Sequence, residues 1–341
     1  MTVDATEETL NLLQVENLST EIKTPDGIMT VLEDINLTMK NGEILSIVGE
    51  SGSGKSMTIH SILQLIPNQL LYGYHGKVSI EGKNLTSLRP KEVKDIRGKK
   101  ISLIAQNAMT SLDPSYRVGT QIVEIITSKT NKSKKEAKEK SLELLKQMGV
   151  DDPMKIYQSF PHQLSGGLKQ RVVIAMSLAC DPDLVIADEP TSALDPTVQI
   201  QVLDLLKKIN KELGTAVLMI THDFGVVARI SDQVAVMYAG QIVEKGSKEE
   251  ILFHPEHPYT KSLMKCIPDL SWIFDPSKGK KPLWQIPGEP PNLKEVTNSC
   301  RFAARCPSAQ SKCTASIPML KKLSGGSQAH EVRCFLTEGV I

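Results

Sequence analysis

The sequence contains no long apolar run, few aromatic residues and almost no net charge. No stretch approaches the roughly 18 consecutive apolar residues of a membrane-spanning helix. Apolar residues make up 40% of the chain and aromatic residues 4%, a composition typical of a soluble α/β protein. The net charge of +1 gives no broad basic surface for nucleic acid.

The first residues also lack the pattern of a secretion signal. The segment MTVDATEETLNLLQ is acidic and has no basic part followed by an apolar part. We therefore expect the protein to stay in the cytosol. If it acts at a membrane, another chain must supply the transmembrane part.

Cysteine is scarce as well, and its six copies are unevenly placed. Four follow the spacing C-x5-C-x6-C-x20-C: Cys300, Cys306, Cys313 and Cys334. A reducing compartment does not sustain a disulfide framework, so the cluster needs another reason. Four thiolates indicate a metal, either Zn²⁺ or an iron–sulfur cluster, although neither the usual zinc pairing nor the ferredoxin run is present. A cluster without metal is the third interpretation.

Strand and helix patterns alternate through most of the chain. Residues 12–48 read as a series of strands. Residues 183–188 (DLVIAD) form an apolar run that ends in an acidic residue, and residues 215–223 (TAVLMITHD) repeat that pattern. Such runs are typical of buried parallel strands. The alternation predicts an α/β fold with a parallel sheet and right-handed crossovers.

The composition of the sequence changes at two further places. A helical and charged stretch covers about 89–182, and we take its Lys/Glu face as a solvated one. Proline and lysine become frequent after Tyr259, and the cysteines follow. We place a boundary near residue 262, which predicts a first domain over 10–262 and a C-terminal extension over 263–341.

The segment GESGSGKS follows a predicted strand and precedes a predicted helix, and it matches G-x-x-x-x-G-K-[ST]. In such a loop the glycines let backbone N–H groups surround phosphates, Lys55 adds a cation, and Ser56 offers a hydroxyl to Mg²⁺. Alone, the loop leaves kinase, GTPase and ATPase open. The residues assigned to ATP are Gly49, Glu50, Ser51, Gly52, Ser53, Gly54, Lys55, Ser56 and Met57.

Acidic residues and a histidine end the two buried strands. Asp188, at the end of its strand beside the phosphate loop, is predicted to hold Mg²⁺. Glu189 follows it and can orient an attacking water. His222 ends the next predicted strand of the sheet, which predicts a position near the γ-phosphate. A capping acid pair and an ordinary strand-end histidine are the alternatives.

A second anion-binding segment, LSGGLKQR, begins at Leu164. Ser165 suits a helix N-cap, and Gly166 and Gly167 permit close backbone approach. The helix that follows points its positive end outward, which makes an anion site. The phosphate loop already provides one such site, so the second must serve a nucleotide held by another copy of this kind of domain.

At this point the chain resembles the ATP-binding subunit of an ATP-binding-cassette (ABC) transporter. The resemblance covers the phosphate loop, LSGGLKQR, and LVIAD followed by Glu189. It adds Gln106 as a residue that senses Mg²⁺ and Asp195 of SALD as part of a loop between paired cassettes. It implies a RecA-like parallel-sheet core, an antiparallel β subdomain, a helical subdomain and a small Cys-rich C-terminal extension. It assigns catalysis to Glu189, His222 and Gln106, and Mg²⁺ to Ser56, Gln106 and Asp188.

Two further segments carry a narrower resemblance. These are QNAMTSLDP, at Gln106, and HPYTKSL, at His257, and both resemble segments of the dipeptide and oligopeptide importer group. In that group the late cysteines imply a [4Fe-4S] cluster. The resemblance departs in two respects. Leu168 stands after LSGG where many family members have glutamine, a change that leaves the role assigned to that segment unaltered. No aromatic residue precedes the phosphate loop to stack on adenine, and only Ile22 or Met29 is available there. We assign no adenine-contacting residue.

The group also implies the partners. These are a second, different ABC ATPase, two transmembrane permease subunits and an extracellular solute-binding protein, with this chain peripheral at the cytoplasmic face of the membrane. No nucleic acid is expected. The alternatives are a cassette for nickel, metal chelates or other small solutes, a soluble ABC ATPase acting on DNA or ribosomes, and an iron–sulfur sensor that uses ATP. The cargo cannot be read from a cassette because cargo does not touch it.

Overall fold

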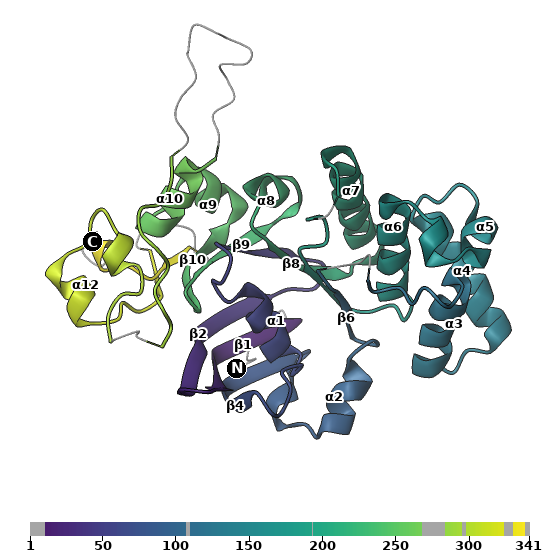
Figure 1. Cartoon of the computed structure of the whole chain (residues 1–341), viewed down its shortest axis with the longest axis horizontal. Coiled ribbons are helices and arrows are strands. Elements are labelled where there is room, and N and C mark those ends of the chain that lie inside the picture. Colours follow the sequence, from purple (N-terminus) through teal and green to yellow (C-terminus); the bar gives the residue numbers. More distant parts are fainter. Residues whose placement is uncertain are drawn as a thin grey trace, which may run out of the picture.

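Two β-sheets and the helices packed around them make up the computed structural model of the chain (Figure 1). The structure describes residues 11–106, 110–192, 194–267, 284–294, 298–323 and 330–337. Within these residues no helix is long and apolar enough to cross a membrane. Two parts of predicted motifs, the three residues after Gln106 and Ala193 of SALD, lie outside the described residues.

The larger sheet contains the predicted parallel strands. Among the described residues its order is β11-β12-β10-β9-β3-β8-β7-β6. The bounds are β3 Ile44–Val48, β6 Ile101–Ile104, β7 Leu184–Asp188, β8 Ala216–Thr221, β9 Gln233–Tyr238, β10 Gln241–Ser247, β11 Lys321–Lys322 and β12 Glu331–Val332. Strands β9, β3, β8, β7 and β6 pair in parallel, and β10, β12 and β11 extend the β9 side antiparallel. Every residue of β3, β7 and β8 is buried, as expected for a parallel sheet covered on both faces.

The smaller sheet is antiparallel and has the order β2-β1-β4-β5. Its strands are β1 Leu13–Thr24, β2 Gly27–Met39, β4 Leu71–Ile80 and β5 Lys83–Asn84. Buried residues of β1 and β2, such as Leu18 and Leu37, share one apolar cluster with Ile47 of the larger sheet and Ile59 of the following helix. The two sheets are therefore joined by a common core beneath the phosphate loop.

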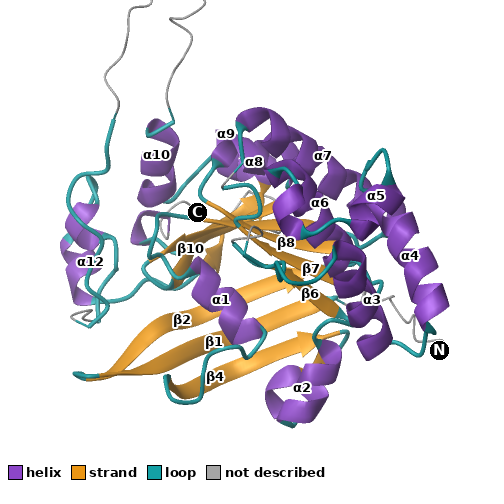
Figure 2. Cartoon of the chain, turned by 45° about the vertical axis from the view of Figure 1, so that its right-hand side comes forward, coloured by secondary structure: helices purple, strands orange, loops and turns teal. Residues whose placement is uncertain are grey.

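Helices cover the larger sheet and form a separate group beside it (Figures 1 and 2). The group consists of α3 Val118–Lys129, α4 Lys134–Gln147, α5 Pro153–Gln158 and α6 Gly166–Ser177. The other helices are α1 Lys55–Ile62, α2 Pro90–Ile96, α7 Pro196–Leu213, α8 Phe224–Ile230, α9 Lys248–Phe253, α10 Pro258–Lys265 and α12 Ser311–Ala315. Short 3-10 turns cover Leu85–Ser87, Pro161–Gln163, Ala303–Arg305 and Phe335–Thr337.

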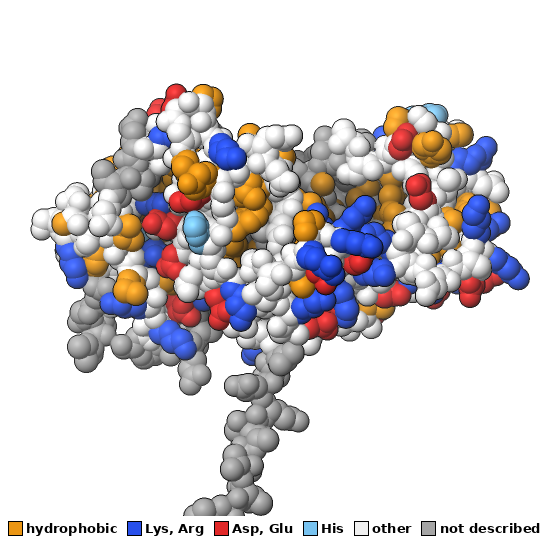
Figure 3. All heavy atoms as spheres, turned by 90° about the horizontal axis from the view of Figure 1, so that it is seen from below, with side chains coloured by type: hydrophobic (Ala, Val, Ile, Leu, Met, Phe, Trp, Pro, Cys, Tyr) orange, Lys and Arg blue, Asp and Glu red, His pale blue; other side chains and the backbone are white. Residues whose placement is uncertain are grey.

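Helix α4 shows how the charged stretch folds. Ser133 caps its N-terminus, with a capping box completed by Glu136. Its buried side includes Leu144 and Leu145, while its Lys and Glu side chains are mostly exposed. On the face of the molecule seen from below, basic and acidic side chains lie beside one another, with hydrophobic patches between them (Figure 3). This view shows no continuous surface of one charge.

Two strands of the parallel sheet, β6 and β9, are missing from the sequence-based prediction. The stretch over about 89–182, predicted as helical, contains β6, which pairs with β7 from Ile101 opposite Leu184. Strand β6 is only four residues long, its two middle residues are partly exposed, and two lysines precede it. Such a short and half-buried strand gives little of the continuous apolar signal that identified β7 and β8.

The described part of the C-terminal region packs back onto the larger sheet. Strand β12 pairs with β10, so Glu331 lies opposite Lys245. The rings of Tyr238, Tyr259 and Phe302 meet with centroid separations of 4.5 to 5.4 Å and join the end of the chain to β9 and α10. The predicted boundary at residue 262 falls inside α10.

Candidate functional site

Neighbouring parallel strands bring the predicted motifs to one edge of the larger sheet. The strands β3, β8, β7 and β6 are adjacent in that order. The phosphate loop follows β3, His222 follows β8, Asp188 and Glu189 end β7, and Gln106 lies just after β6. Because parallel strands end at the same edge, residues far apart in sequence converge there.

The phosphate loop depends on two glycines with different roles. At Gly49 an added Cβ would lie 2.2 Å from the carbonyl oxygen of Met237, so only glycine fits against β9. Gly54, the N-cap of α1, has φ +105°, a left-handed conformation that glycine adopts readily. The loop therefore turns tightly from β3 into the positive end of α1.

The loop presents hydrogen-bond donors that lack a full set of acceptors. Lys55 Nζ donates to the carbonyl oxygens of Gly49 and Glu50, each at 2.9 Å. Burial lowers the pKa of Lys55, and the nearby carboxylates, first that of Glu189, oppose the shift. The hydroxyl of Ser53 is buried and has no hydrogen-bond partner among the described residues. A buried cation and an unpaired hydroxyl under a helix N-terminus suit a phosphate group.

Ser56 and Asp188 meet at the start of α1. Ser56 Oγ donates to Asp188 Oδ1 at 3.2 Å. Burial raises the pKa of Asp188, and the Ser56 hydrogen bond opposes the shift. A hydroxyl and a buried carboxylate provide the oxygen ligands that Mg²⁺ prefers. The third predicted ligand, Gln106, instead contacts Glu189.

Glu189 is held between two side chains. Gln106 Nε2 donates to Glu189 Oε2 at 3.3 Å, and His222 Nδ1 lies 3.1 Å from Glu189 Oε1. The Glu189 side chain is 16% exposed, whereas His222 is 62% exposed. Glu189 has φ +45°, an uncommon conformation for a residue with a side chain, and its N–H donates to the carbonyl oxygen of Ile220 at 3.0 Å. The strained backbone turns this carboxylate out of β7 toward Gln106 and His222.

The segment LSGG lies apart from this cluster. Ser165 caps α6, because its Oγ accepts a hydrogen bond from the N–H of Leu168 at 3.4 Å. An added Cβ at Gly167 would lie 3.0 Å from Val198 of α7. Among the described residues no hydrogen bond joins Leu164, Ser165, Gly166 or Gly167 to the phosphate loop. In the described residues the positive end of α6 therefore has no hydrogen bond to the phosphate loop of its own chain.

Asp195 lies beside that segment and caps α7. Its Oδ1 accepts hydrogen bonds from the N–H groups of Thr197 at 3.1 Å and Val198 at 3.0 Å. Val198 is also the residue against which Gly167 packs, so the two predicted interface segments are adjacent. Their helix N-termini, those of α6 and α7, meet in one part of the structure.

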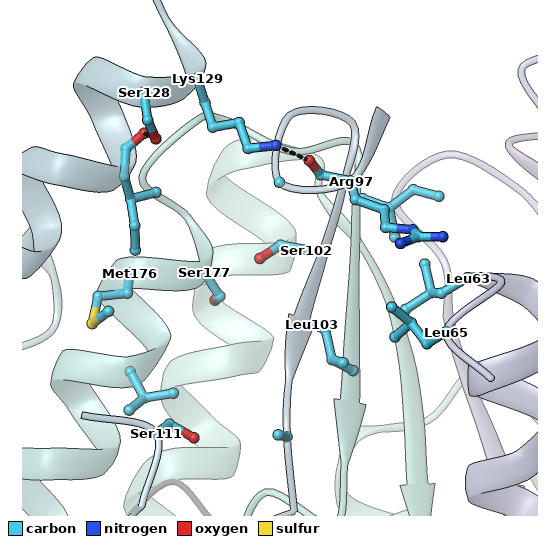
Figure 4. Close-up of a pocket in the computed structure, with 15 residues that line it drawn as sticks. Leu63, Leu65, Arg97, Ser102, Leu103, Ser111, Ser128, Lys129, Met176 and Ser177 are labelled. Atoms are coloured by element: carbon cyan, nitrogen blue, oxygen red, sulfur yellow. Dashed lines mark hydrogen bonds between the residues drawn. The ribbon is translucent and has the colours of Figure 1, made fainter. Parts of the chain in front are cut away.

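A groove of about 420 Å³ lies between the helical group and the sheet (Figure 4). Leu103 of β6 and Met176 of α6 line opposite sides, and Leu65 follows α1 at one end. Lys129 Nζ closes one margin by donating to the carbonyl oxygen of Arg97 at 2.9 Å. The groove adjoins β6 and Ala105, so a ligand in it would contact the segment that leads to Gln106.

The iron–sulfur prediction is wrong. Among the described residues no group of three or more His, Cys, Asp or Glu side chains is placed to hold a metal ion. Cys300 and Cys306 pack instead against the apolar cluster that contains Phe302, and Cys313 and Cys334 are buried. Burial raises the pKa of Cys300 to about 11, so the uncoordinated thiol is neutral. The same finding removes the zinc alternative.

The fold and the converging motifs define an ATP-binding cassette. Residues 32–192 match the family described as "ABC transporter", and residues 243–313 match "Oligopeptide/dipeptide transporter, C-terminal region". The dimeric cassette MJ0796 bound to ADP and Pi shares the fold with a TM-score of 0.61 and 31% identity, over 69% of this chain and 98% of that one.

Curated relatives are similar over almost the whole chain. The oligopeptide transport ATP-binding protein OppD of Bacillus subtilis is 45% identical over 95% of this chain and 88% of the relative. OppD of Salmonella typhimurium is 43% identical over 90% of each chain. The dipeptide transport ATP-binding protein DppD of Bacillus subtilis is 41% identical over 96% of this chain and 95% of the relative. The chain belongs to this family of oligopeptide and dipeptide transport ATP-binding proteins.

Proposed function

We propose that the chain is the ATP-hydrolysing subunit that powers a membrane importer of dipeptides and oligopeptides. One observation supports it most directly: Glu189 is held by Gln106 and His222 at the sheet edge that also carries the phosphate loop. The names of the relatives, which are oligopeptide and dipeptide transport proteins, support the cargo class. The chain acts as a peripheral subunit at the cytoplasmic face of the membrane.

The chemistry is phosphoryl transfer from ATP to water. Backbone N–H groups of the loop and Lys55 hold the β- and γ-phosphates, and Glu189 accepts a proton from the attacking water. His222 and Gln106 keep the Glu189 carboxylate in one orientation, which raises the fraction of time that it faces the water. Ser56 and Asp188 would hold Mg²⁺, which neutralises phosphate charge when bound.

Hydrolysis requires a second cassette. The outward-facing N-terminus of α6, capped by Ser165, is the part that would close over a nucleotide bound to the partner. Asp195 lies next to it and would take part in the same interface. The dimeric state of the similar cassette MJ0796 supports pairing. We propose a different ATPase chain as the partner, as the importer group implies.

The groove of Figure 4 is the proposed contact for the membrane subunits. Leu103 and Met176 give it an apolar lining, and it lies between the helical group and the sheet. A permease helix bound in this groove would contact both the helical group and the sheet, and would therefore couple their movements. Two permease subunits and an extracellular solute-binding protein complete the proposed assembly.

The proposed division of the chain follows the same family. Residues 10–262 form the cassette, with a helical subdomain over about 89–182 that also contributes β6. Residues 263–341 form the C-terminal extension, which includes the four cysteines. The ring cluster around Tyr259 supports a fixed position of the described part of that extension against β9.

Uptake of labelled peptides tests the cargo class. We expect cells that lack this chain to lose ATP-dependent uptake of labelled dipeptides or oligopeptides, and cells given the chain back to recover it. The same cells are assayed with labelled nickel as the control for the metal-cassette alternative. Loss of nickel uptake with unchanged peptide uptake would contradict a peptide importer.

A further inference from the structure

The C-terminal segment reaches the phosphate loop through a buried arginine. Arg305 Nη1 donates to Glu50 Oε2 at 2.9 Å, and Nη2 donates to Glu50 Oε1 at 3.2 Å. The Arg305 side chain is only 6% exposed. Its Nε donates to the carbonyl oxygen of Pro287 at 3.0 Å, and Nη1 also lies 3.3 Å from the Tyr238 hydroxyl. This bidentate contact fixes the orientation of the Glu50 carboxylate as well as its distance from the Arg305 guanidinium.

A second residue of the same region holds the backbone of Glu50. The N–H of Glu50 donates to the hydroxyl of Tyr259 at 3.0 Å. The Tyr259 side chain is fully buried, and its ring packs at an angle against the rings of Tyr238 and Phe302. The hydroxyl therefore has little freedom to move.

Glu50 is thus held by three of its groups. Arg305 binds its carboxylate, Tyr259 accepts from its N–H, and Lys55 donates to its carbonyl oxygen. Glu50 directly follows Gly49, where the chain leaves β3 and the phosphate loop begins. A displacement of Glu50 would move the N–H groups of the loop and the anchor of Lys55 together.

We propose that Arg305 and Tyr259 are positioning residues for ATP, through which the C-terminal extension holds the phosphate loop in its binding conformation. The inference rests on the proposed ATPase function and adds a residue set outside the loop to its nucleotide site. Neither residue touches the nucleotide. Both act by fixing Glu50, so their loss lowers the affinity for ATP.

An alternative hypothesis is that Arg305 only attaches the C-terminal extension to the rest of the fold. A second arginine distinguishes this structural role from a role in positioning Glu50. Arg333 is also buried and also binds a carboxylate, since its Nη2 donates to Asp34 Oδ2 at 2.8 Å. It further donates to the carbonyl oxygens of Ile242 and Pro318 and contacts no residue of the phosphate loop. Arg333→Met therefore loosens the attachment of the extension without touching Glu50.

The test measures ATP affinity of the full-length chain by titration calorimetry, in a Glu189→Gln background that prevents turnover. We expect Arg305→Met to weaken ATP binding about tenfold and Tyr259→Phe about fivefold. Arg333→Met is expected to stay within about twofold of the parent. Melting temperatures without ATP report how much each variant loosens the fold.

The outcomes separate the two hypotheses. Equal affinities of the Arg305→Met and Arg333→Met variants, at similar melting temperatures, would overturn the positioning role and leave the ATPase function standing. If Arg305→Met does not fold, Tyr259→Phe decides, because it removes a single oxygen atom. In a Glu50→Gln background the effect of Arg305→Met should shrink, as the two residues act through one contact. If the parent chain itself does not bind ATP, the proposed function fails first.

Discussion

Glu189→Gln is expected to lower ATP turnover of the assembled transporter by at least about a hundredfold, while ATP binding persists. The amide cannot accept the proton of the attacking water, so the general base is lost. Its oxygen can still accept from Gln106, and the side chain keeps its length, so the loop and Asp188 keep their places. ATP-driven pairing with the partner cassette therefore survives, because closure needs the nucleotide but not its hydrolysis.

Turnover is measured as phosphate release, and pairing as the ATP-dependent shift in a sedimentation or gel-filtration profile. Glu249→Gln is the matched control, since it makes the same change at an exposed position of α9, where Lys248 Nζ lies 3.7 Å from Glu249 Oε1. That variant should hydrolyse ATP like the unmodified chain. A Glu189→Gln assembly that releases phosphate at the unmodified rate would show that another group is the base.

Lys55→Met is expected to weaken ATP binding by the chain about a hundredfold, because the loop loses the one cation placed to face phosphate. The unliganded fold should not lose stability. Burial already disfavours the charged amine, as its lowered pKa shows, and methionine fills a similar volume without a charge to desolvate.

Titration calorimetry measures the affinity, and thermal unfolding without nucleotide measures the stability. Lys91→Met, at an exposed position of α2, is the control and should change neither quantity. Unchanged affinity of Lys55→Met would contradict the phosphate site. A large drop in melting temperature would instead make Lys55 a structural residue.

The parts of the site that could be predicted from sequence are those encoded locally. DLVIAD and TAVLMITHD signal buried strands, and their last residues are Asp188, Glu189 and His222. Parallel pairing of β7 with β8 then places those residues at one edge without further information. Likewise Ser165 sits where an N-cap is expected, because capping depends on the residues next to it.

The features that escaped prediction depend on contacts between distant segments. Arg305 and Glu50 are 255 residues apart, and an arginine between two alanines and a cysteine carries no local sign of its partner. The cysteine spacing led to a wrong prediction of an iron–sulfur cluster for a related reason. Spacing in the sequence does not determine which residues surround each side chain. In the fold Cys300 and Cys306 pack against an apolar cluster that includes Phe302, where a neutral thiol is favoured.

The central claim is that the segment LSGGLKQR, which begins at Leu164, serves the nucleotide of the partner and not that of its own chain. The most direct test places Ser165→Arg in this chain and measures two quantities. We expect ATP affinity of the isolated full-length chain to stay within about twofold of the unmodified value, and ATP turnover of the assembly at the partner's site to fall at least about tenfold. Unreduced turnover at the partner's site, or a clear loss of ATP affinity in the isolated chain, would contradict the claim.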